Sequence, residues 1–256
     1  MKLKTDEQMK ENYIHPSANL GENVSVGLYT VIRENVKIGS NCRIGSQVVI
    51  HPGTEIGENV RIDDHTAIGK LPMKAKISAT TSEKILSPAV VGSDSLIGTG
   101  VVIYAGATLG KGVLVADLAT IREDVLVGDY TIVGRGVAIE NFCQIGSYCK
   151  LETNSYITAY SHLEDRVFIS PGVVTSNDNF VGRTKERFKH FKGVTVKEGG
   201  RIGANSTILP GKIIAKESLV AAGSVVTKDT PPGKIVKGSP AKEWREVPKE
   251  QLLENQ

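Results

Sequence analysis

An aliphatic residue recurs at every sixth position along most of this chain, and a small residue follows four places after each of them. The first run of aliphatic residues is Ile14, Leu20, Val26, Ile32, Ile38, Ile44, Ile50, Ile56, Ile62 and Ile68. The same spacing holds from Val91 to Ile169 and again from Val196 to Val226. A short fixed period indicates a solenoid, in which each unit packs only against its neighbours.

Each six-residue unit is expected to form one short strand and one corner. The aliphatic residue points inward and stacks on its equivalent in the next coil, roughly 4.8 Å away. The corner favours positive φ, which Gly adopts freely and Asn or Asp at modest cost. Such residues fill the fourth place of the unit at Asn23, Asn35, Asn41, Gly53, Asn59, Asp94, Gly100, Gly106, Gly112, Gly136, Asn154 and Gly172. The pattern resembles the hexapeptide left-handed parallel β-helix, an all-β fold with three units per coil and an exception to right-handed crossovers.

Two segments break the repeat, residues 70–90 and 175–195, and each is predicted to loop out from a corner. The second loop carries six basic residues: Arg183, Lys185, Arg187, Lys189, His190 and Lys192. Long loops at the corners of a solenoid favour a role in binding, with contact to another subunit as the alternative. Residues 1–228 are assigned to the β-helix domain, in which residues 1–13 form a polar lead over the first coil.

Residues 229–256 form a tail. Ser239-Pro240 is typical of a helix start, with an N-cap followed by proline at the first helical position. A short C-terminal helix, interrupted at Pro248, is therefore predicted to cover the open end of the coil and its unpaired strand edges.

Composition narrows the classes of function. The net charge is +3, with acidic and basic residues interspersed, which argues against nucleic-acid and membrane partners. No apolar run approaches 18 residues and the first residues are highly charged, so a cytoplasmic protein is expected. Cys42, Cys143 and Cys149 occupy small inward positions, which favours buried, reduced thiols over a disulfide or a catalytic thiol.

Residues 18 apart lie in one column, because three units make one coil. Most units have Gly at their second place, but the units that start at 103, 121, 139 and 157 do not. Their second places are Tyr104, Arg122, Glu140 and Thr158, their third places Ala105, Glu123, Asn141 and Ala159, and their fourth places Gly106, Asp124, Phe142 and Tyr160. If the first loop preserves the phase of the coil, His15, Arg33 and His51 continue this column. One edge of the prism is thus rich in functional groups and is the candidate active site.

A resemblance to a known enzyme family rests on several segments. They are AGSVVTKD from Ala222, KGSPAK from Lys237, IREDVLVGDYTIVGRGVAIEN, and YITAYSHLEDRVFISPGVVTSNDNF. The chain resembles the acyl-CoA-dependent N-acyltransferases that act on nucleotide-linked amino sugars, over nearly its whole length. Within them it is most similar to the dTDP-3-amino-3,6-dideoxyglucose N-acetyltransferases. The resemblance implies acetyl transfer from acetyl-CoA to the C-3 amino group of a dTDP-linked sugar for surface glycan biosynthesis of the S-layer or O-antigen type.

The family also implies an assembly and a coenzyme site. It implies a homotrimer with active sites in the grooves between subunits. The pantetheine of acetyl-CoA would bond to the backbone near Ala204 and Ala222, a backbone N–H near Ser170 or Gly172 would stabilise the oxyanion, and Lys228, Lys237 and Lys242 would meet the phosphates. No metal is expected.

The family also implies roles for the column. Related enzymes place a His where the substrate amine loses its proton, and that position is Ala159 here. His162 lies on another side of the turn and is interpreted as structural or solvated. The closest subgroup resembles this sequence in offering Asn and Glu in the same column. The resemblance thus implies that Asn141 holds the C-3 amine and that Glu123 fixes the sugar or a water. Tyr104, Arg122, Glu140 and Tyr160 would line the sugar pocket, and Lys74 and Lys76 would meet the diphosphate.

Two alternatives remain open, and two others are disfavoured. The substrate could be UDP-linked or carry a 4-amino group, and the chain could be a scaffold without catalytic activity. A γ-type carbonic anhydrase needs three His at one zinc, whereas the five here (His15, His51, His65, His162 and His190) do not form such a set. A lipid A acyltransferase that uses acyl carrier protein is disfavoured by the CoA-like tail and the basic loop.

Overall fold

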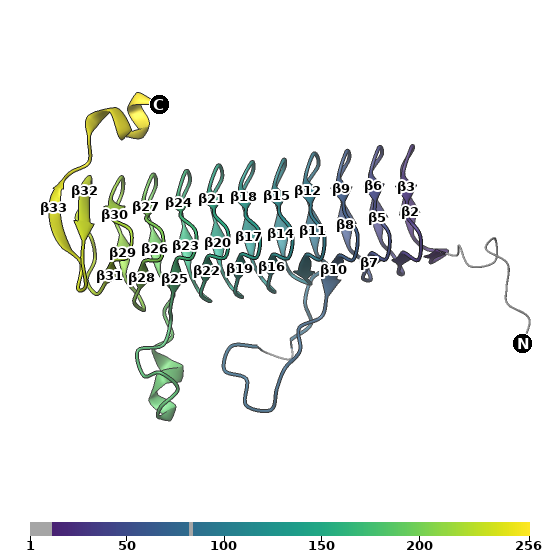
Figure 1. The fold of residues 1–256 in the computed structure, drawn as a ribbon. Helices are drawn as coiled ribbons and strands as arrows, with labels where there is room; N and C mark the ends of the chain where they lie inside the picture. The colour runs from purple at the N-terminus through teal and green to yellow at the C-terminus, as the bar shows by residue number, and fades with distance from the viewer. Residues whose placement is uncertain (1–11, 82–83) are drawn as a thin grey trace, which may run out of the picture.

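The computed structural model describes residues 12–81 and 84–256, and over these residues the chain winds into a left-handed parallel β-helix (Figure 1). Three flat sheets form the sides of the prism, here called sheets A, B and C, with 11, 10 and 12 strands respectively. The predicted fold class is confirmed. All but two residues of the predicted polar lead, residues 1–11, lie outside the described part.

Most strands are only two residues long, and successive strands visit sheets A, B and C in turn. Sheet A holds β1 (Tyr13–Ile14), β4 (Val31–Ile32), β7 (Val49–Ile50), β10 (Ala67–Lys70), β13 (Val102–Tyr104), β16 (Thr120–Ile121), β19 (Ala138–Ile139), β22 (Tyr156–Ile157), β25 (Val174–Thr175), β28 (Thr207–Ile208) and β31 (Val225–Val226). Sheet B holds β2 (Asn19–Leu20), β5 (Lys37–Ile38), β8 (Glu55–Ile56), β11 (Val90–Val91), β14 (Thr108–Leu109), β17 (Leu126–Val127), β20 (Gln144–Ile145), β23 (His162–Leu163), β26 (Thr195–Val196) and β29 (Ile213–Ile214). Sheet C holds β3 (Ser25–Val26), β6 (Arg43–Ile44), β9 (Arg61–Ile62), β12 (Leu96–Ile97), β15 (Leu114–Val115), β18 (Ile132–Val133), β21 (Lys150–Leu151), β24 (Phe168–Ile169), β27 (Arg201–Ile202), β30 (Leu219–Val220), β32 (Lys234–Lys237) and β33 (Lys242–Glu246).

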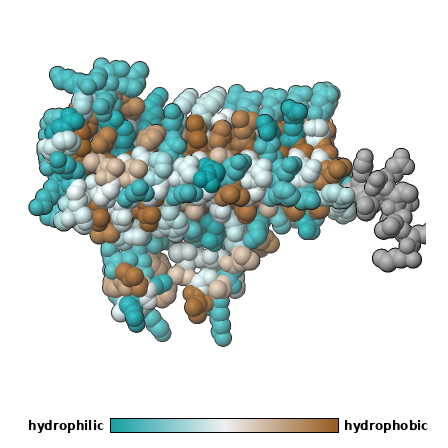
Figure 2. All heavy atoms as spheres, in the orientation of Figure 1, coloured by the Kyte–Doolittle hydropathy of each residue, from teal (hydrophilic) through white to brown (hydrophobic). Residues whose placement is uncertain are grey.

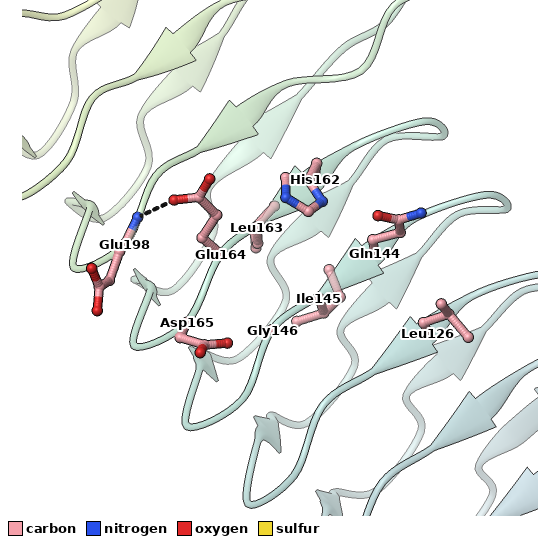
Figure 3. Close-up of a pocket in the computed structure, with 9 residues that line it drawn as sticks. All are labelled: Leu126, Gln144, Ile145, Gly146, His162, Leu163, Glu164, Asp165 and Glu198. Atoms are coloured by element: carbon pink, nitrogen blue, oxygen red, sulfur yellow. Dashed lines mark hydrogen bonds between the residues drawn. The ribbon is translucent and has the colours of Figure 1, made fainter.

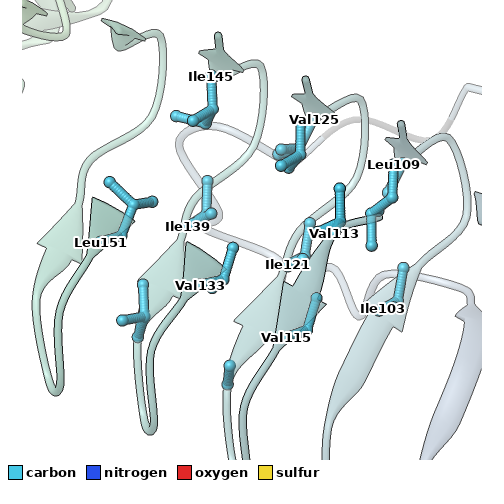
Figure 4. Packing of buried hydrophobic residues seen from close by; sticks show 14 of the residues in the cluster. Ile103, Leu109, Val113, Val115, Ile121, Val125, Val133, Ile139, Ile145 and Leu151 are labelled. Atoms are coloured by element: carbon cyan, nitrogen blue, oxygen red, sulfur yellow. The ribbon is translucent and has the colours of Figure 1, made fainter. Parts of the chain in front are cut away.

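The core is a narrow column inside the prism. The aliphatic residues of successive coils point inward from all three sheets and stack along the axis (Figure 4). Ile103, Ile121, Ile139 and Ile157 of sheet A are all fully buried. Cys42, Cys143 and Cys149 lie in this core as free thiols, and burial raises the pKa of Cys143 to about 12. The predicted buried, reduced cysteines are confirmed.

The corners have the predicted backbone conformation. All twelve Asn, Asp and Gly residues named above as corner residues have positive φ, between 57° and 83°. The same conformation recurs at bulky residues, including Phe142 (63°) and Tyr160 (66°). For a residue with a Cβ it costs roughly 1–2 kcal/mol, so the coil imposes it even where the side chain does not favour it.

Both loops leave the prism at the same corner, the one between sheets A and B, here called the A–B corner. The first loop runs from β10 to β11, and the second runs from β25 to β26. The second loop contains the short 3-10 helix η2 (Lys185–Lys189). Figure 1 shows the two loops projecting on one side of the coil. Ile68 pairs with Ile103 across the first loop, so the loop preserves the phase of the coil. His15, Arg33 and His51 therefore continue the column, as predicted.

The predicted C-terminal helix is wrong. The residues after Pro240 form β33, which pairs antiparallel with β32, and only the 3-10 turns η3 (Lys249–Gln251) and η4 (Leu253–Asn255) follow. Ser239-Pro240 lies in the turn between the two strands. The last coil offers unpaired backbone groups, and pairing with them outweighs the local signal for a helix. The tail still covers this end of the coil, since the N–H of Ala241 donates to the carbonyl of Val225 at 2.8 Å.

Glycine at the second place of the unit is required by the spacing of the coils. A Cβ at Gly128 would lie 2.6 Å from the carbonyl carbon of Gly146 and 2.6 Å from the nitrogen of Ser147. We expect Gly128→Ala to destabilise the fold by about 3 kcal/mol, near the top of the usual range for overpacking. Thermal unfolding followed by circular dichroism measures the loss.

Gly223→Ala is the matched control. Gly223 has φ of 69° and open space around its missing Cβ, so only the backbone conformation is penalised, by about 1 kcal/mol. A larger loss for Gly223→Ala than for Gly128→Ala would contradict the steric explanation.

Candidate active site

The functional column lies on the A–B corner between the two loops. Four corners stand there in succession, and their third-place residues are Ala105, Glu123, Asn141 and Ala159. The first loop lies on one side of the series and the second loop on the other (Figure 1). The sequence predicted the column, but it did not show that both loops leave from the same corner as the column.

This corner differs from the others in its hydrogen bonding. Elsewhere a Ser or Asp at the third place accepts the backbone N–H of the coil before it. Asp129 Oδ1, for example, accepts the N–H of Lys111, and Asp165 Oδ1 that of Ser147, both at 2.8 Å. The third-place residues Glu123 and Asn141 instead bond to a neighbouring side chain and to the first loop. Their side chains are thereby available for a functional site.

Arg122 and Glu123 form a closely bonded ion pair. Arg122 Nε donates to Glu123 Oε2 at 2.8 Å and Nη2 to Oε1 at 3.0 Å, so both carboxylate oxygens are held. The Glu123 residue is only 3% exposed. Burial lowers the pKa of Arg122, but the hydrogen bonds and charge of Glu123 and the charge of Glu140 outweigh it and raise the pKa overall. The pair is a fixed charged unit within the corner.

Glu140 extends this cluster by one coil. Its Oε2 lies 3.4 Å from Arg122 Nη1, and Tyr156 hydrogen-bonds to it from the next strand of sheet A. Burial raises the pKa of the Glu140 carboxyl, and the charge of Glu123 adds to this, whereas Arg122 and the Tyr156 hydrogen bond oppose it. Glu140 therefore holds a proton more readily than an ordinary glutamate.

Asn141 is fully buried beside the first loop. Its Nδ2 donates to the carbonyl oxygen of Thr80 at 2.9 Å. A carbonyl oxygen only accepts, so this bond fixes the orientation of the amide and leaves Oδ1 as the free acceptor. Among the residues that the structure describes, none donates a hydrogen bond to Oδ1. A buried acceptor without a donor costs about 1–3 kcal/mol, which a ligand N–H in this position would recover.

The first loop packs along the column at several points. Arg122 Nη2 donates to Thr81 Oγ1 at 3.2 Å, next to the residue that holds Asn141. Lys84 pairs with Asp124 at 2.8 Å and lies 5.4 Å from the ring centroid of Phe142. Glu123, through Arg122, and Asn141 thus face the same stretch of the loop, as the shared column requires.

Two aromatic groups flank the cluster. The Tyr104 ring has Lys70 Nζ 4.8 Å from its centroid and Arg122 Cζ at 5.1 Å. The rings of Phe142 and Tyr160 stack at 5.2 Å and 10°, and burial raises the pKa of the Tyr160 hydroxyl. Ala159, which stands where the resemblance places a His, directly precedes Tyr160 and is only 3% exposed. Lys74 and Lys76 lie exposed on the first loop.

The residues predicted to bind the coenzyme lie at a different corner. Ser170, Gly172, Ala204 and Ala222 occupy successive coils at the corner between sheets C and A, here called the C–A corner. The N–H of Ser170 donates to the carbonyl of Ile202 at 2.9 Å, and that of Gly172 to Thr153 at 3.1 Å. Both N–H groups are therefore engaged in the coil.

The three C-terminal lysines gather at the end of the coil. Lys237 and Lys242 are register partners in β32 and β33, and Lys237 Nζ lies 3.8 Å from the ring centroid of Trp244. Lys228 and Lys242 line a cavity of about 260 Å³ that Thr230 and Ala241 also line. The sequence grouped these lysines by resemblance, and the structure places them close together.

A groove on sheet B was not predicted. It has a volume of about 510 Å³ and lies over β20 and β23, with His162, Glu164 and Glu198 among its lining residues (Figure 3). Gly146, at the second place of its unit, has no side chain to fill the groove. This glycine was the sequence feature from which the groove could have been predicted. His162 lies on the outer face of sheet B, whereas Asn141 follows β19 of sheet A, so the predicted separation of His162 from the column is confirmed.

The described residues contain neither a cluster of metal ligands nor a membrane-spanning helix. Within residues 12–81 and 84–256, no three His, Cys, Asp or Glu side chains are placed to hold a metal ion. In that same part of the chain, no helix has the length and apolar character needed to cross a membrane.

Comparison with known proteins gives matches to two hexapeptide families. The model described as "Bacterial transferase hexapeptide (six repeats)" matches residues 17–52 and 35–70, and "Hexapeptide repeat of succinyl-transferase" matches residues 88–116 and 193–228. A dTDP-3-amino-3,6-dideoxy-alpha-D-galactopyranose 3-N-acetyltransferase of Aneurinibacillus thermoaerophilus is 48% identical over 52 residues, which cover 20% of this chain and 27% of that protein. A 2,3,4,5-tetrahydropyridine-2,6-dicarboxylate N-acetyltransferase of Staphylococcus aureus is 47% identical over 49 residues, 19% of this chain and 20% of that protein.

Solved structures match over most of the chain. The Arabidopsis UDP-N-acetylglucosamine acyltransferase has a TM-score of 0.63 at 18% identity, covering 92% of this chain and 72% of the other. The enzyme of the same name from Bacteroides fragilis has a TM-score of 0.50 at 23% identity, covering 91% and 72%. At these identities the likeness establishes the fold. The matched repeats over residues 17–70, 88–116 and 193–228 are therefore similar to the hexapeptide repeats of transferases, and the coil they form is the left-handed β-helix.

Proposed function

We propose that this protein is an acetyl-CoA-dependent N-acetyltransferase whose acceptor is the C-3 amino group of a dTDP-linked 3-amino-3,6-dideoxyhexose. The observation that carries the proposal is the Asn141 amide, whose orientation Thr80 fixes and whose buried Oδ1 has no donor among the described residues. An acceptor presented this way matches an N–H donor, and an amine supplies one. The partial match to a dTDP-amino-sugar N-acetyltransferase supports the same acceptor class.

In the proposed mechanism, positioning supplies much of the rate. The neutral amine donates a hydrogen bond to Asn141 Oδ1, which aims its lone pair at the thioester carbonyl. Holding two reactants in this way lowers the barrier by on the order of 7–11 kcal/mol at best. The C–N bond forms, the C–S bond breaks, and the departing thiolate takes up the second amine proton. Because Oδ1 is shielded from solvent, the amine enters only when the first loop opens beside Thr80.

The sugar and its nucleotide would lie along the same corner. Glu123, which is paired with Arg122, is the candidate to bind a sugar hydroxyl or a water. Arg122 and Glu140 would line the sugar pocket beside it. Tyr104 and Tyr160 would contact the ring, and Lys74 and Lys76 would meet the diphosphate. Acetyl-CoA and nucleotide sugars are cytoplasmic metabolites, which agrees with the expected location and a role in surface glycan synthesis.

The coenzyme site is proposed to need a second copy of the chain. The A–B corner carries Asn141, whereas Ala204, Ala222, Ser170 and Gly172 lie at the C–A corner, across sheet A. In a homotrimer the C–A corner of one copy lies against the A–B corner of another, and Lys228, Lys237 and Lys242 then meet the phosphates. Exposed apolar residues on both loops, such as Ile77 (92% exposed), Ile85 (99%) and Val181 (84%), suit burial against another copy (Figure 2). Sedimentation velocity should give three times the mass of one chain.

A panel of acceptors tests the activity. Purified protein and acetyl-CoA are mixed with dTDP-3-amino-3,6-dideoxyglucose, its galacto isomer, a UDP-linked 4-amino sugar and tetrahydropyridine-2,6-dicarboxylate, and free thiol is followed. We expect thiol release with the dTDP-linked 3-amino sugars. Release with the dicarboxylate alone would assign a different acceptor, and release with none would indicate a scaffold without catalytic activity.

A further inference from the structure

Between the two loops the column contains three carboxylates, and two of them have an ion pair of 2.8 Å. Both oxygens of Glu123 accept from Arg122, and Asp124 pairs with Lys84 at 2.8 Å. Protonating either one means giving up a close ion pair. Neither is therefore suited to take a proton from a substrate.

Glu140 differs in its contacts. Its distance to Arg122 is 3.4 Å, longer than either bond from Arg122 to Glu123, and its side chain is 24% exposed against 4% for Glu123. The charged and titratable groups around it are Arg122 and Glu123 of the preceding coil and Tyr156 of the following strand. It directly precedes Asn141 in the chain. It is thus the carboxylate of this cluster that is partly accessible to solvent and belongs to the same corner as the acceptor amide.

The proposed reaction needs such a group. A sugar amine arrives largely as an ammonium ion at neutral pH, and the Asn141 amide accepts a hydrogen bond but does not remove a proton. The histidine nearest to Asn141 in sequence is not placed to act as the base here. The column position where the resemblance places a His is Ala159, and His162 lies on sheet B. The proton must therefore pass to a carboxylate or to water.

We propose that Glu140 is the general base that removes the first proton from the bound sugar ammonium. This inference rests on the proposed function. The ammonium N–H bond breaks, the carboxylate of Glu140 becomes a carboxylic acid, and the neutral amine attacks the thioester while Asn141 holds it. The second proton leaves with the thiolate as the thiol, and Glu140 returns its proton to water after product release. The balance is one amide, one thiol and one proton from one ammonium and one thioester.

The environment of Glu140 suits this task. Burial and the neighbouring Glu123 raise its pKa, so the carboxylate is a stronger base than an exposed glutamate. The base acts only when ionised, and activity should therefore fall as the pH drops through this raised pKa. The charge of Arg122, which is held by Glu123, opposes this rise in pKa.

Glu140→Gln tests the assignment by its pH profile, with dTDP-3-amino-3,6-dideoxyglucose or the acceptor from the panel that proves active. We expect kcat/KM to fall by about 100-fold or more at neutral pH, with the acidic limb moved up from the pKa of Glu140 to the pKa of the sugar amine. Above the pKa of the sugar amine, where the substrate is already neutral, the deficit should shrink to about 10-fold or less. A variant that is merely misfolded would show no such recovery. Glu34→Gln, on the same corner beyond the first loop, is the matched control and should keep the wild-type profile.

The outcomes separate this inference from the proposed function. If the wild-type protein releases no thiol with any acceptor, the proposed function fails. If the wild type is active and Glu140→Gln keeps its rate and acidic limb, the proposed function stands and the assignment of the base is overturned. A deficit that stays constant at all pH values, with unchanged melting temperature, also overturns it.

Discussion

Replacing Asn141 with alanine should lower kcat by about 100- to 1,000-fold, as loss of a positioned polar group in other active sites does. Asn141 offers a buried acceptor whose direction is set by the bond from Nδ2 to Thr80. Without it, the amine loses its alignment with the thioester. Free-thiol release at saturating acetyl-CoA measures the change, and sedimentation velocity together with the melting temperature checks that the variant folds and assembles.

His162→Ala is the control for this experiment. His162 lies on sheet B over the groove of Figure 3 rather than on the A–B corner, so its removal should leave kcat near the wild-type value. An essential His162 with a dispensable Asn141 would refute the placement of the active site on the A–B corner.

Glu123→Gln should reduce both stability and activity. The change leaves the Arg122 guanidinium, whose side chain is only 21% exposed, without its closest anion. Breaking a buried pair from one side costs about 3–5 kcal/mol, and the partial exposure of Arg122 together with the nearby Glu140 points to about 3 kcal/mol. Chemical denaturation measures this loss.

The same variant should also move the acidic limb of the pH profile. The charge of Glu123 raises the pKa of Glu140, and its removal lets Arg122 act on Glu140 alone, so the pKa of Glu140 falls. The limb should therefore shift to lower pH, although the maximal rate is reduced. A shift to higher pH would contradict the coupling between the three residues.

A double variant separates the two roles of the pair. Arg122→Met with Glu123→Leu removes both charges and fills similar volumes, which is often neutral for stability. It should recover most of the stability lost in Glu123→Gln but none of the activity. Recovery of activity would show that the pair serves only the fold.

The coil was predictable because its period is short and its steric demands are local. A residue with positive φ falls at each predicted corner, and aliphatic stacking sets the register, so Ile68 pairs with Ile103 despite the intervening loop. The column of Glu123 and Asn141 followed from the same arithmetic. Sequence spacing alone sufficed there, since each unit contacts only its neighbours.

The features that were missed depend on contacts between distant segments. Ser239-Pro240 carries a local helix signal, but backbone pairing of β33 with β32 overrides it. The N–H groups of Ser170 and Gly172 are consumed by the coil's own ladder, which a resemblance does not show. The bond from Asn141 to Thr80 joins residues 61 positions apart, across an irregular loop that has no period to extrapolate.

Because Ile68 and Ile103 pair in the phase of the coil, with only a local register shift between Ile68 and Lys70, the first loop is an insertion that leaves the neighbouring coils in place. The length and composition of this loop can change, or the loop can be replaced by that of a relative, without moving the coils on either side. The surface that the first loop presents beside the A–B corner can thus evolve separately from the coil that carries it.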